Sequence, residues 1–307
     1  MSVKMDISVY FSPGGIRIAT GSFSKGTIIL RRLITVPIER DAIIGGVITN
    51  DRALKKALAD AWKHNMLPKK NIRLTVDGGA VLLKPLTVPL TSRKNLRSII
   101  SGEFSDVENA DELLIDYAVD EPALADGGAS VIAYAAGRKF IGSYVELFSD
   151  IKCRIKSINT AQNCCISYMK LTGAAEGKTC ILACADGNIL LLLLFVNGKY
   201  SFSSRVRLFS EGGTREYAEE ICGAVSSMIQ FHKAQRYGTE LRDIFFCGLG
   251  EDHAEVFHAA ESSFENQKIS DLSIPVGCIT RRGNGISAED AESMSDYIYC
   301  LGNLISL

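Results

Sequence analysis

The chain has 307 residues, of which 47% are hydrophobic, and a formal net charge of −1. This length exceeds one ordinary domain, so we expect two lobes, and near-neutral charge without a basic stretch disfavours nucleic-acid binding. The first residues lack the apolar stretch of a signal peptide, and the longest apolar run, at 189–196, is too short to span a bilayer. We therefore expect a cytoplasmic protein.

Nine cysteines are scattered through apolar segments with no Cys-x-x-Cys spacing. This pattern is typical of free, buried thiols in a reducing compartment. His253 and His258 are five residues apart, which does not place them on one face of a helix. We therefore expect neither disulfides nor a metal site.

The first part of the chain predicts three antiparallel strands, a helix and a fourth strand. The strands are expected at 7–11, 16–22, 27–36 and 72–76, and the helix at 51–65. Pro13-Gly14-Gly15 forms the first turn, and Pro68 ends the helix. Asp77-Gly78-Gly79 after the fourth strand fits a plain turn, although a phosphate-binding loop stays open as an alternative.

The sequence pattern changes after residue 80. We expect a strand ending in the proline-flanked segment Pro85–Pro89, then alternating helices and strands. The helices are predicted at 92–104 and 139–149, and the strands at 113–119, 130–136 and 153–158. A helix at 160–172 then leads into the second half of the chain.

A three-strand meander dominates the second half. Its strands are expected at 180–185, 189–196 and 200–207, and Asn197-Gly198 is a strong hairpin signal between the last two. A long helical pattern at 213–236 leads into a strand at 244–246 and the turn Gly248-Leu249-Gly250. A helix at 251–264, a strand at 268–272, a loop at 275–277 and a final helix at 288–305 complete the pattern.

This order of elements resembles the actin-type ATPase domain, and its local residues resemble the family of the type IV pilus assembly protein PilM and the cell-division protein FtsA. Asn197-Gly198 with Arg205, the late helical run 230–235, and Gly248-Leu249-Gly250 carry the resemblance. So does the segment at 80–158, which stands where these proteins carry a subdomain that actin lacks. The resemblance implies an α/β, actin-like (ribonuclease H-type) two-lobe ATPase fold with an inserted FtsA/PilM-type subdomain.

The same resemblance implies a division of the chain. Residues 1–79 would form the first lobe, 80–158 the inserted subdomain, 159–175 a linking helix of the first lobe, 176–285 the second lobe, and 286–307 a C-terminal helix that returns to the first lobe.

In the family, two hairpins hold the phosphates of ATP with Mg²⁺, and a glycine turn lies beside the adenosine. Aligning the first hairpin places Arg17 on the family's Lys, Tyr10 on its Asp and Ser12 on its Gly. In the second hairpin Cys184 falls on the Asp and Asp186 on the Gly, although a one-residue shift would let Asp186-Gly187 serve instead.

A retained nucleotide site would therefore use two hairpins and the glycine turn. Its residues would be Ser12, Gly14, Gly15, Arg17, Asp186, Gly187, Gly248 and Gly250. A phenol at the position of the first carboxylate removes a charge and crowds the phosphates. We expect impaired nucleotide binding and assign no catalytic residue.

The family resemblance implies an adaptor or scaffold on the cytoplasmic face of the cell membrane, in a type IV pilus or type II secretion platform. Membrane association would come only through partners, and self-association stays open. The alternative is a functional actin-type ATPase or small-molecule kinase of the same fold.

The implied partner is the N-terminal cytoplasmic peptide of a single-pass inner-membrane protein like PilN, held between the first lobe and the inserted subdomain. The side chains that would line this groove are Leu86, Val88, Leu96, Ile99, Ile100, Phe104 and Tyr117. The competing interpretation is that they form the core of the subdomain. The exposure of these side chains distinguishes the two interpretations, because a peptide-binding site leaves apolar side chains open to water whereas a core buries them.

Overall fold

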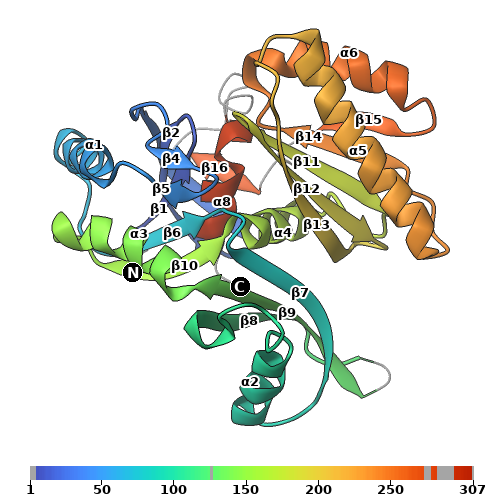
Figure 1. The fold of residues 1–307 in the computed structure, drawn as a ribbon, viewed down its shortest axis with the longest axis horizontal. Coiled ribbons are helices and arrows are strands. Elements are labelled where there is room, and N and C mark those ends of the chain that lie inside the picture. Colours follow the sequence, from blue (N-terminus) through green and yellow to red (C-terminus); the bar gives the residue numbers. More distant parts are fainter. Residues whose placement is uncertain (1–4, 125–126, 273–277, 282–293, 306–307) are drawn as a thin grey trace.

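The computed structural model describes residues 5–124, 127–272, 278–281 and 294–305. Its elements form two large sheets, each covered by helices, and a smaller sheet that hangs below the first (Figure 1). The loop predicted at 275–277 and the first residues predicted for the final helix, 288–293, lie outside the described part of the chain.

The first large sheet has six strands in the order β10-β6-β1-β2-β3-β16. Their bounds are β1 (Asp6–Ser12), β2 (Gly15–Ser24), β3 (Thr27–Val36), β6 (Ile72–Val76), β10 (Ile155–Thr160) and β16 (Ile279–Arg281). Helices α1 (Asp51–His64) and α3 (Arg138–Asp150) share one core with this sheet, in which Leu54 and Leu58 of α1 meet Phe148 of α3. The short strands β4 (Ile43–Ile44) and β5 (Val47–Ile48) pair beside them.

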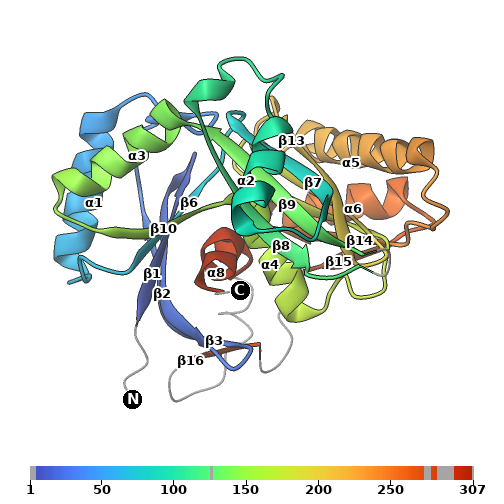
Figure 2. The same cartoon turned by 90° about the horizontal axis from the view of Figure 1, so that it is seen from below.

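The smaller sheet has three strands in the order β7-β9-β8. The strands are β7 (Val81–Pro89), β8 (Leu113–Glu121) and β9 (Gly128–Gly137), and α2 (Arg93–Gly102) packs on them. In Figures 1 and 2, α2 lies on the side of this sheet that faces away from α3. The last strand of the three-stranded sheet along the chain is β9, which ends at Gly137. The next strand, β10, already belongs to the first large sheet, because it pairs with β6. The division of the chain at residue 158 stays a prediction.

The second large sheet has five strands in the order β13-β12-β11-β14-β15. They are β11 (Cys180–Asp186), β12 (Ile189–Val196), β13 (Lys199–Arg207), β14 (Asp243–Cys247) and β15 (Lys268–Asp271). Every side chain of β12 from Ile189 to Phe195 is buried, as its unbroken apolar run predicts for a strand covered on both faces. One cover is formed by α5 (Arg215–Gln235) and α6 (His253–Ser263).

Two helices fill the space between the large sheets, α4 (Ala161–Thr172) and α8 (Ile298–Leu304) (Figure 2). They pack closely because residue 302 has no side chain. A Cβ built on Gly302 would lie 2.1 Å from the carbonyl oxygen of Cys164 in α4. This contact fixes α8 against the middle of the molecule and thereby joins the end of the chain to both lobes.

Gly302→Ala should lower the free energy of unfolding by about 1–3 kcal/mol, because the new methyl group must push α8 away from α4. Gly223→Ala in α5 is the matched control, since no atom lies within 4 Å of a Cβ built there. The control should raise the free energy of unfolding by about 0.5–1 kcal/mol through helix propensity. Urea denaturation measures both, and equal effects of the two substitutions would contradict the packing described here.

Candidate functional site: the cleft between the two lobes

The turns that join β1 to β2 and β11 to β12 face each other across the cleft between the large sheets. They come from opposite lobes and lie close together, since a Cβ built on Gly187 would be 3.8 Å from Cβ of Pro13. Both turns end their strands with polar side chains, Ser12 on one side and Asp186 on the other. The cleft therefore brings together the two hairpins that the sequence predicts as phosphate-binding elements.

Asp186 is the centre of a hydrogen-bond network that crosses the cleft. The phenol of Tyr10 donates to Oδ2 of Asp186 at 2.7 Å, and the hydroxyl of Ser12 donates to Oδ1 at 2.6 Å. The guanidinium of Arg17 lies 3.4 Å from Oδ1 and also donates to the backbone carbonyl of Asp296 at 2.6 Å. Asp186 is only 2% exposed. Tyr10, Ser12 and Arg17, all from the opposite lobe, compensate its buried charge.

A second ion pair crosses the cleft, and in this pair the second lobe provides the guanidinium and the first lobe the carboxylate. Arg205 of β13 donates to Oδ2 of Asp77, the residue after β6, at 2.8 Å. Asp77 is enclosed by the turn between β4 and β5, because a Cβ on Gly46 would lie 1.9 Å from the carbonyl oxygen of Asp77. Each lobe thus provides one carboxylate and one guanidinium to the cleft.

Burial shifts the titration of the groups in this network. Burial and the neighbouring Asp186 raise the pKa of Tyr10 well above its ordinary value, so the phenol stays protonated and remains a donor. Burial also raises the pKa of Asp77, and the charge of Arg205 partly offsets this rise. The Tyr10 phenol thus satisfies the carboxylate without adding a second charge.

Cys184 takes no part in the network. It lies one step deeper on the same face of β11, where its Sγ is 3.7 Å from Sγ of Cys165 and 3.1 Å from Sγ of Cys247. Burial raises the pKa of the Cys184 thiol well above its ordinary value. The position that aligns with the family's second carboxylate is therefore part of the apolar core.

Two of the predicted glycines, Gly15 and Gly248, occupy positions where the packed backbone leaves no room for a Cβ. Gly248 follows β14 with a φ of +72°, and a Cβ there would lie 2.2 Å from the carbonyl oxygen of Ala185. A Cβ on Gly15 would lie 2.8 Å from the carbonyl oxygen of Val36, whereas a Cβ on Gly14 would meet only Oγ of Ser12, at 3.9 Å, and one on Gly250 would have no atom within 4 Å. Close backbone packing alone accounts for Gly248 and Gly15, without a nucleotide.

The residues of the cleft do not fit a magnesium nucleotide in this arrangement. Both oxygens of Asp186 already accept bonds from Tyr10 and Ser12, and Arg17 is held between Asp186 and a backbone carbonyl. Five buried side-chain oxygens have no partner among the described residues, and two of them are Oδ1 of Asp77 and Oε1 of Gln162 in the first turn of α4. The described residues contain no group of three side chains placed to hold a metal ion.

A separate groove of about 270 Å³ lies between the first lobe and the three-stranded sheet. Leu114, Ile115 and Asp116 of β8 form one wall, and Ile141 of α3 and Ile158 of β10 belong to the other. These residues were not predicted from the sequence, because they come from three separate elements that only the fold brings together.

None of the seven side chains predicted to bind the partner lines this groove. Val88, Ile100 and Phe104 are at most 3% exposed and form the core of the inserted subdomain. A further three are half-buried against that core: Leu86, Leu96 and Tyr117. Ile99 is the exception, with 37% of its surface exposed. The physical reason is that α2 covers the far face of the three-stranded sheet, so its apolar stripe faces that sheet.

No protein-family model matches this sequence, and no curated protein is significantly similar to it in sequence. Its structure is similar to a chain of the "PilM-PilN type IV pilus biogenesis complex", with a TM-score of 0.77, 12% identity and 97% of each chain covered. It is also similar to a Bacteroides thetaiotaomicron protein with an actin-like ATPase fold, with a TM-score of 0.53, 9% identity and coverage of 88% of this chain and 91% of that one.

These similarities define the class of protein: the chain has an actin-like ATPase fold, and the predicted fold class is confirmed. In the described residues, no helix has the length and apolar character that crossing a membrane requires.

Tyr10→Phe should lower the free energy of unfolding by about 1.5–3 kcal/mol, because it removes a hydrogen bond to a buried, charged carboxylate. Tyr237→Phe is the matched control, since its hydroxyl bonds to Ser201 at the exposed surface, and it should change the free energy of unfolding by less than about 0.5 kcal/mol. Urea denaturation compares them. A Tyr10→Phe effect no larger than that of the control would show that the network contributes little to the union of the lobes.

Proposed function

We propose that this protein is a non-catalytic adaptor of the actin fold, whose cleft is held closed by its own side chains. The observation that carries the proposal is the occupation of Asp186 by Tyr10, Ser12 and Arg17. A phosphate group entering between the hairpins would have to displace donors from a buried carboxylate and would meet the negative charge of Asp186. Both effects oppose nucleotide binding.

The adaptor would work on the cytoplasmic face of the inner membrane, in a type IV pilus or type II secretion platform. Its partner would be the N-terminal cytoplasmic peptide of a single-pass membrane protein like PilN. The support is the similarity over 97% of the chain to a structure described as a PilM-PilN complex, together with the lack of a fit to nucleotide in the cleft. Membrane association would then come through this partner.

For the peptide we propose the groove between the first lobe and the inserted subdomain. Leu114 is 36% exposed and lies beside Ile141 and Ile158, so an extended peptide would find apolar walls there. Both β8 and β10 are edge strands of their sheets within the described residues. A peptide between them gains main-chain hydrogen bonds as well as apolar contacts.

An actin-type ATPase or small-molecule kinase is the second candidate. Oδ1 of Asp77 and Oε1 of Gln162 favour it, because among the described residues they are buried acceptors without a hydrogen-bond partner. Such atoms could position a water molecule or a hydroxyl group if the lobes opened. The engagement of Asp186 and Arg17 makes this the weaker candidate.

Isothermal titration with ATP and Mg²⁺ should give little heat and no measurable hydrolysis, because the network must break before phosphates enter. A dissociation constant in the micromolar range or below would contradict the adaptor proposal. In that case Asp77→Asn would reveal whether the second candidate holds, since it should remove any ATP hydrolysis while leaving the donors to Asp186 in place.

Leu114→Asp should abolish capture of the N-terminal peptide of a single-pass membrane protein encoded by a neighbouring gene, because a buried carboxylate would replace an apolar contact in the groove. Ile99→Asp is the matched control, with nearly equal exposure, 37% against 36%, on the far face of the subdomain. It should leave capture unchanged. Pull-down with purified variants of equal melting temperature measures this.

The reverse result, with capture lost only in Ile99→Asp, would place the peptide on α2, as the sequence predicts. Unchanged capture by both folded variants would place the partner elsewhere on the protein.

A further inference from the structure

A pocket of about 520 Å³ lies at the edge of the first lobe, where α1 and α3 both end. Trp62 and Leu67 form the buried part of its wall. Asp150 also lines the pocket, but its carboxylate is already paired with Lys55 at 2.8 Å. The remaining charged residues of the lining are three lysines: Lys63, Lys69 and Lys152.

The positive charge extends beyond the pocket. Lys70 follows Lys69 in the loop after α1, and Arg154 donates its backbone N–H to the carbonyl oxygen of Lys69 at 2.8 Å. All five basic side chains are exposed, and none of them forms an ion pair with another described residue. Asp60 of α1 adds one exposed carboxylate a turn before this end of the helix. The basic surface is defined here as Lys63, Lys69, Lys70, Lys152 and Arg154.

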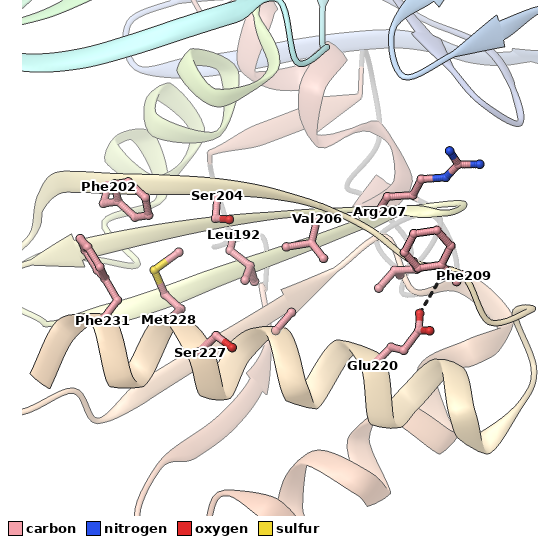
Figure 3. A pocket seen from close by; sticks show the side chains of 12 residues that line it. Leu192, Phe202, Ser204, Val206, Arg207, Phe209, Glu220, Ser227, Met228 and Phe231 are labelled. Atoms are coloured by element: carbon pink, nitrogen blue, oxygen red, sulfur yellow. Dashed lines mark hydrogen bonds between the residues drawn. The ribbon is translucent and has the colours of Figure 1, made fainter. Parts of the chain in front are cut away.

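Other hollows of the molecule show no such excess of one charge. The groove between α5 and β13 in the second lobe has mostly apolar walls (Figure 3). Its charged residues are one guanidinium, Arg207, and one carboxylate, Glu220. The peptide groove beside β8 contains a single charged residue, Asp116. The uncompensated lysines are therefore particular to the pocket at the ends of α1 and α3.

Both helices end at this pocket in the same unusual way. Each closes with the pair of backbone hydrogen bonds of a Schellman motif, whose last residue adopts a left-handed conformation. Those residues are Met66, with a φ of +49°, and Lys152, with a φ of +57°. Glycine is the usual residue in this position, because a Cβ disfavours the conformation. Both side chains are exposed, Met66 by 85%, so packing within the fold does not account for them.

The ends of the helices explain only part of the charge. The partial negative charge at the C-terminus of a helix favours a basic residue such as Lys63 in its last turn. Lys69, Lys70 and Arg154 lie outside both helices, so this effect does not account for them. Because they spread the charge over more than one pocket, the surface suits an extended anionic partner better than a single small anion.

Met66 indicates which extended partner fits. A phospholipid surface offers phosphate groups to basic side chains and, just below them, an apolar layer to an inserted side chain. Long basic side chains with exposed ends are suited to contact headgroups at such an interface. An acidic protein or a nucleic acid would satisfy the lysines but would leave no use for an exposed methionine among them.

We propose that the basic surface binds an anionic phospholipid membrane directly, with Met66 inserted between the headgroups. The peptide groove uses Ile141 near the start of α3, and the pocket uses Asp150 at its end, about 14 Å further along the helix. A peptide of a membrane protein and the lipid around it would thus meet the same lobe. The lipid contact adds to association through the partner and does not depend on it.

Co-sedimentation of the full-length protein with vesicles tests the proposal. Vesicles of phosphatidylcholine with about one third phosphatidylglycerol should bind it about tenfold more tightly than pure phosphatidylcholine. Sodium chloride at about 0.5 M should remove this difference, because it screens the charges. Lys69→Glu should weaken binding to the anionic vesicles about tenfold, since it reverses one charge of the basic surface.

Lys152→Gly and Met66→Gly should each weaken binding to the anionic vesicles about fivefold. Both should keep or raise the melting temperature, because glycine suits the left-handed position better. A loss of binding in these variants therefore does not come from unfolding. Leu114→Asp, which alters the peptide groove, should leave vesicle binding unchanged.

Two variants of the second lobe serve as matched controls. Arg236→Gly removes an exposed basic side chain from the left-handed residue that ends α5, where φ is +53°. Phe209→Ser removes an apolar side chain that is 82% exposed, close to the 85% of Met66. Both controls should bind the anionic vesicles like the wild type.

Equal binding to the two kinds of vesicle, no binding to either, or equal effects of variants and controls would overturn the proposal. Unchanged binding by Met66→Gly would also overturn it, because no side chain would then enter the lipid. Tighter binding of polyglutamate or duplex DNA than of the vesicles would assign the surface to a soluble polyanion. Glycerol phosphate that displaces the protein at the same concentration as lipid phosphate would assign it to a single small anion.

Discussion

The carboxylate of Asp186 is buried between the two lobes, and its charge has to be compensated by hydrogen-bond donors of the protein. Asp186 is nearly inaccessible to water, and an uncompensated charge in such a place would cost several kcal/mol. Tyr10, Ser12 and Arg17 provide the compensation, and all three belong to the other lobe. The lobes therefore cannot separate without exposing Asp186 to water and breaking its bonds. The Arg205 and Asp77 pair applies the same constraint in the opposite direction.

This arrangement changes what the actin-like cleft does. Hairpins that face each other across a cleft are suited to hold a ligand between them, but here Ser12 of one hairpin already donates a hydrogen bond to Asp186 of the other. Below the hairpins, α4 and α8 join the two sheets through an apolar core that includes the thiol of Cys184. The polar network above and the core below both act on the relative position of the lobes. We infer that the network and the core together hold the two lobes in a fixed relative position.

Local patterns predicted most of the fold. The apolar run of β12, the Asn197-Gly198 turn and the stripe of α1 each report on burial or turn geometry within one element, and the structure has these elements where they were expected. Alignment also singled out Tyr10, Arg17 and Asp186. It could not show that the three bond to one another, because Tyr10 and Asp186 are 176 residues apart. For the same reason periodicity identified α2 as amphipathic but did not reveal which face of the sheet it covers, and the residues of the groove beside β8 were not predicted.

Hydrogen exchange at the two hairpins reports whether the cleft is closed without a ligand. If Tyr10, Ser12 and Arg17 hold it closed, amides of residues 8–20 and 181–192 are strongly protected in the free protein, and saturating ATP with Mg²⁺ leaves their exchange rates unchanged. Asp186→Ala should raise the exchange rates on both sides of the cleft. Rapid exchange at both hairpins in the free protein, followed by protection when ATP is added, would show instead that a nucleotide closes the cleft.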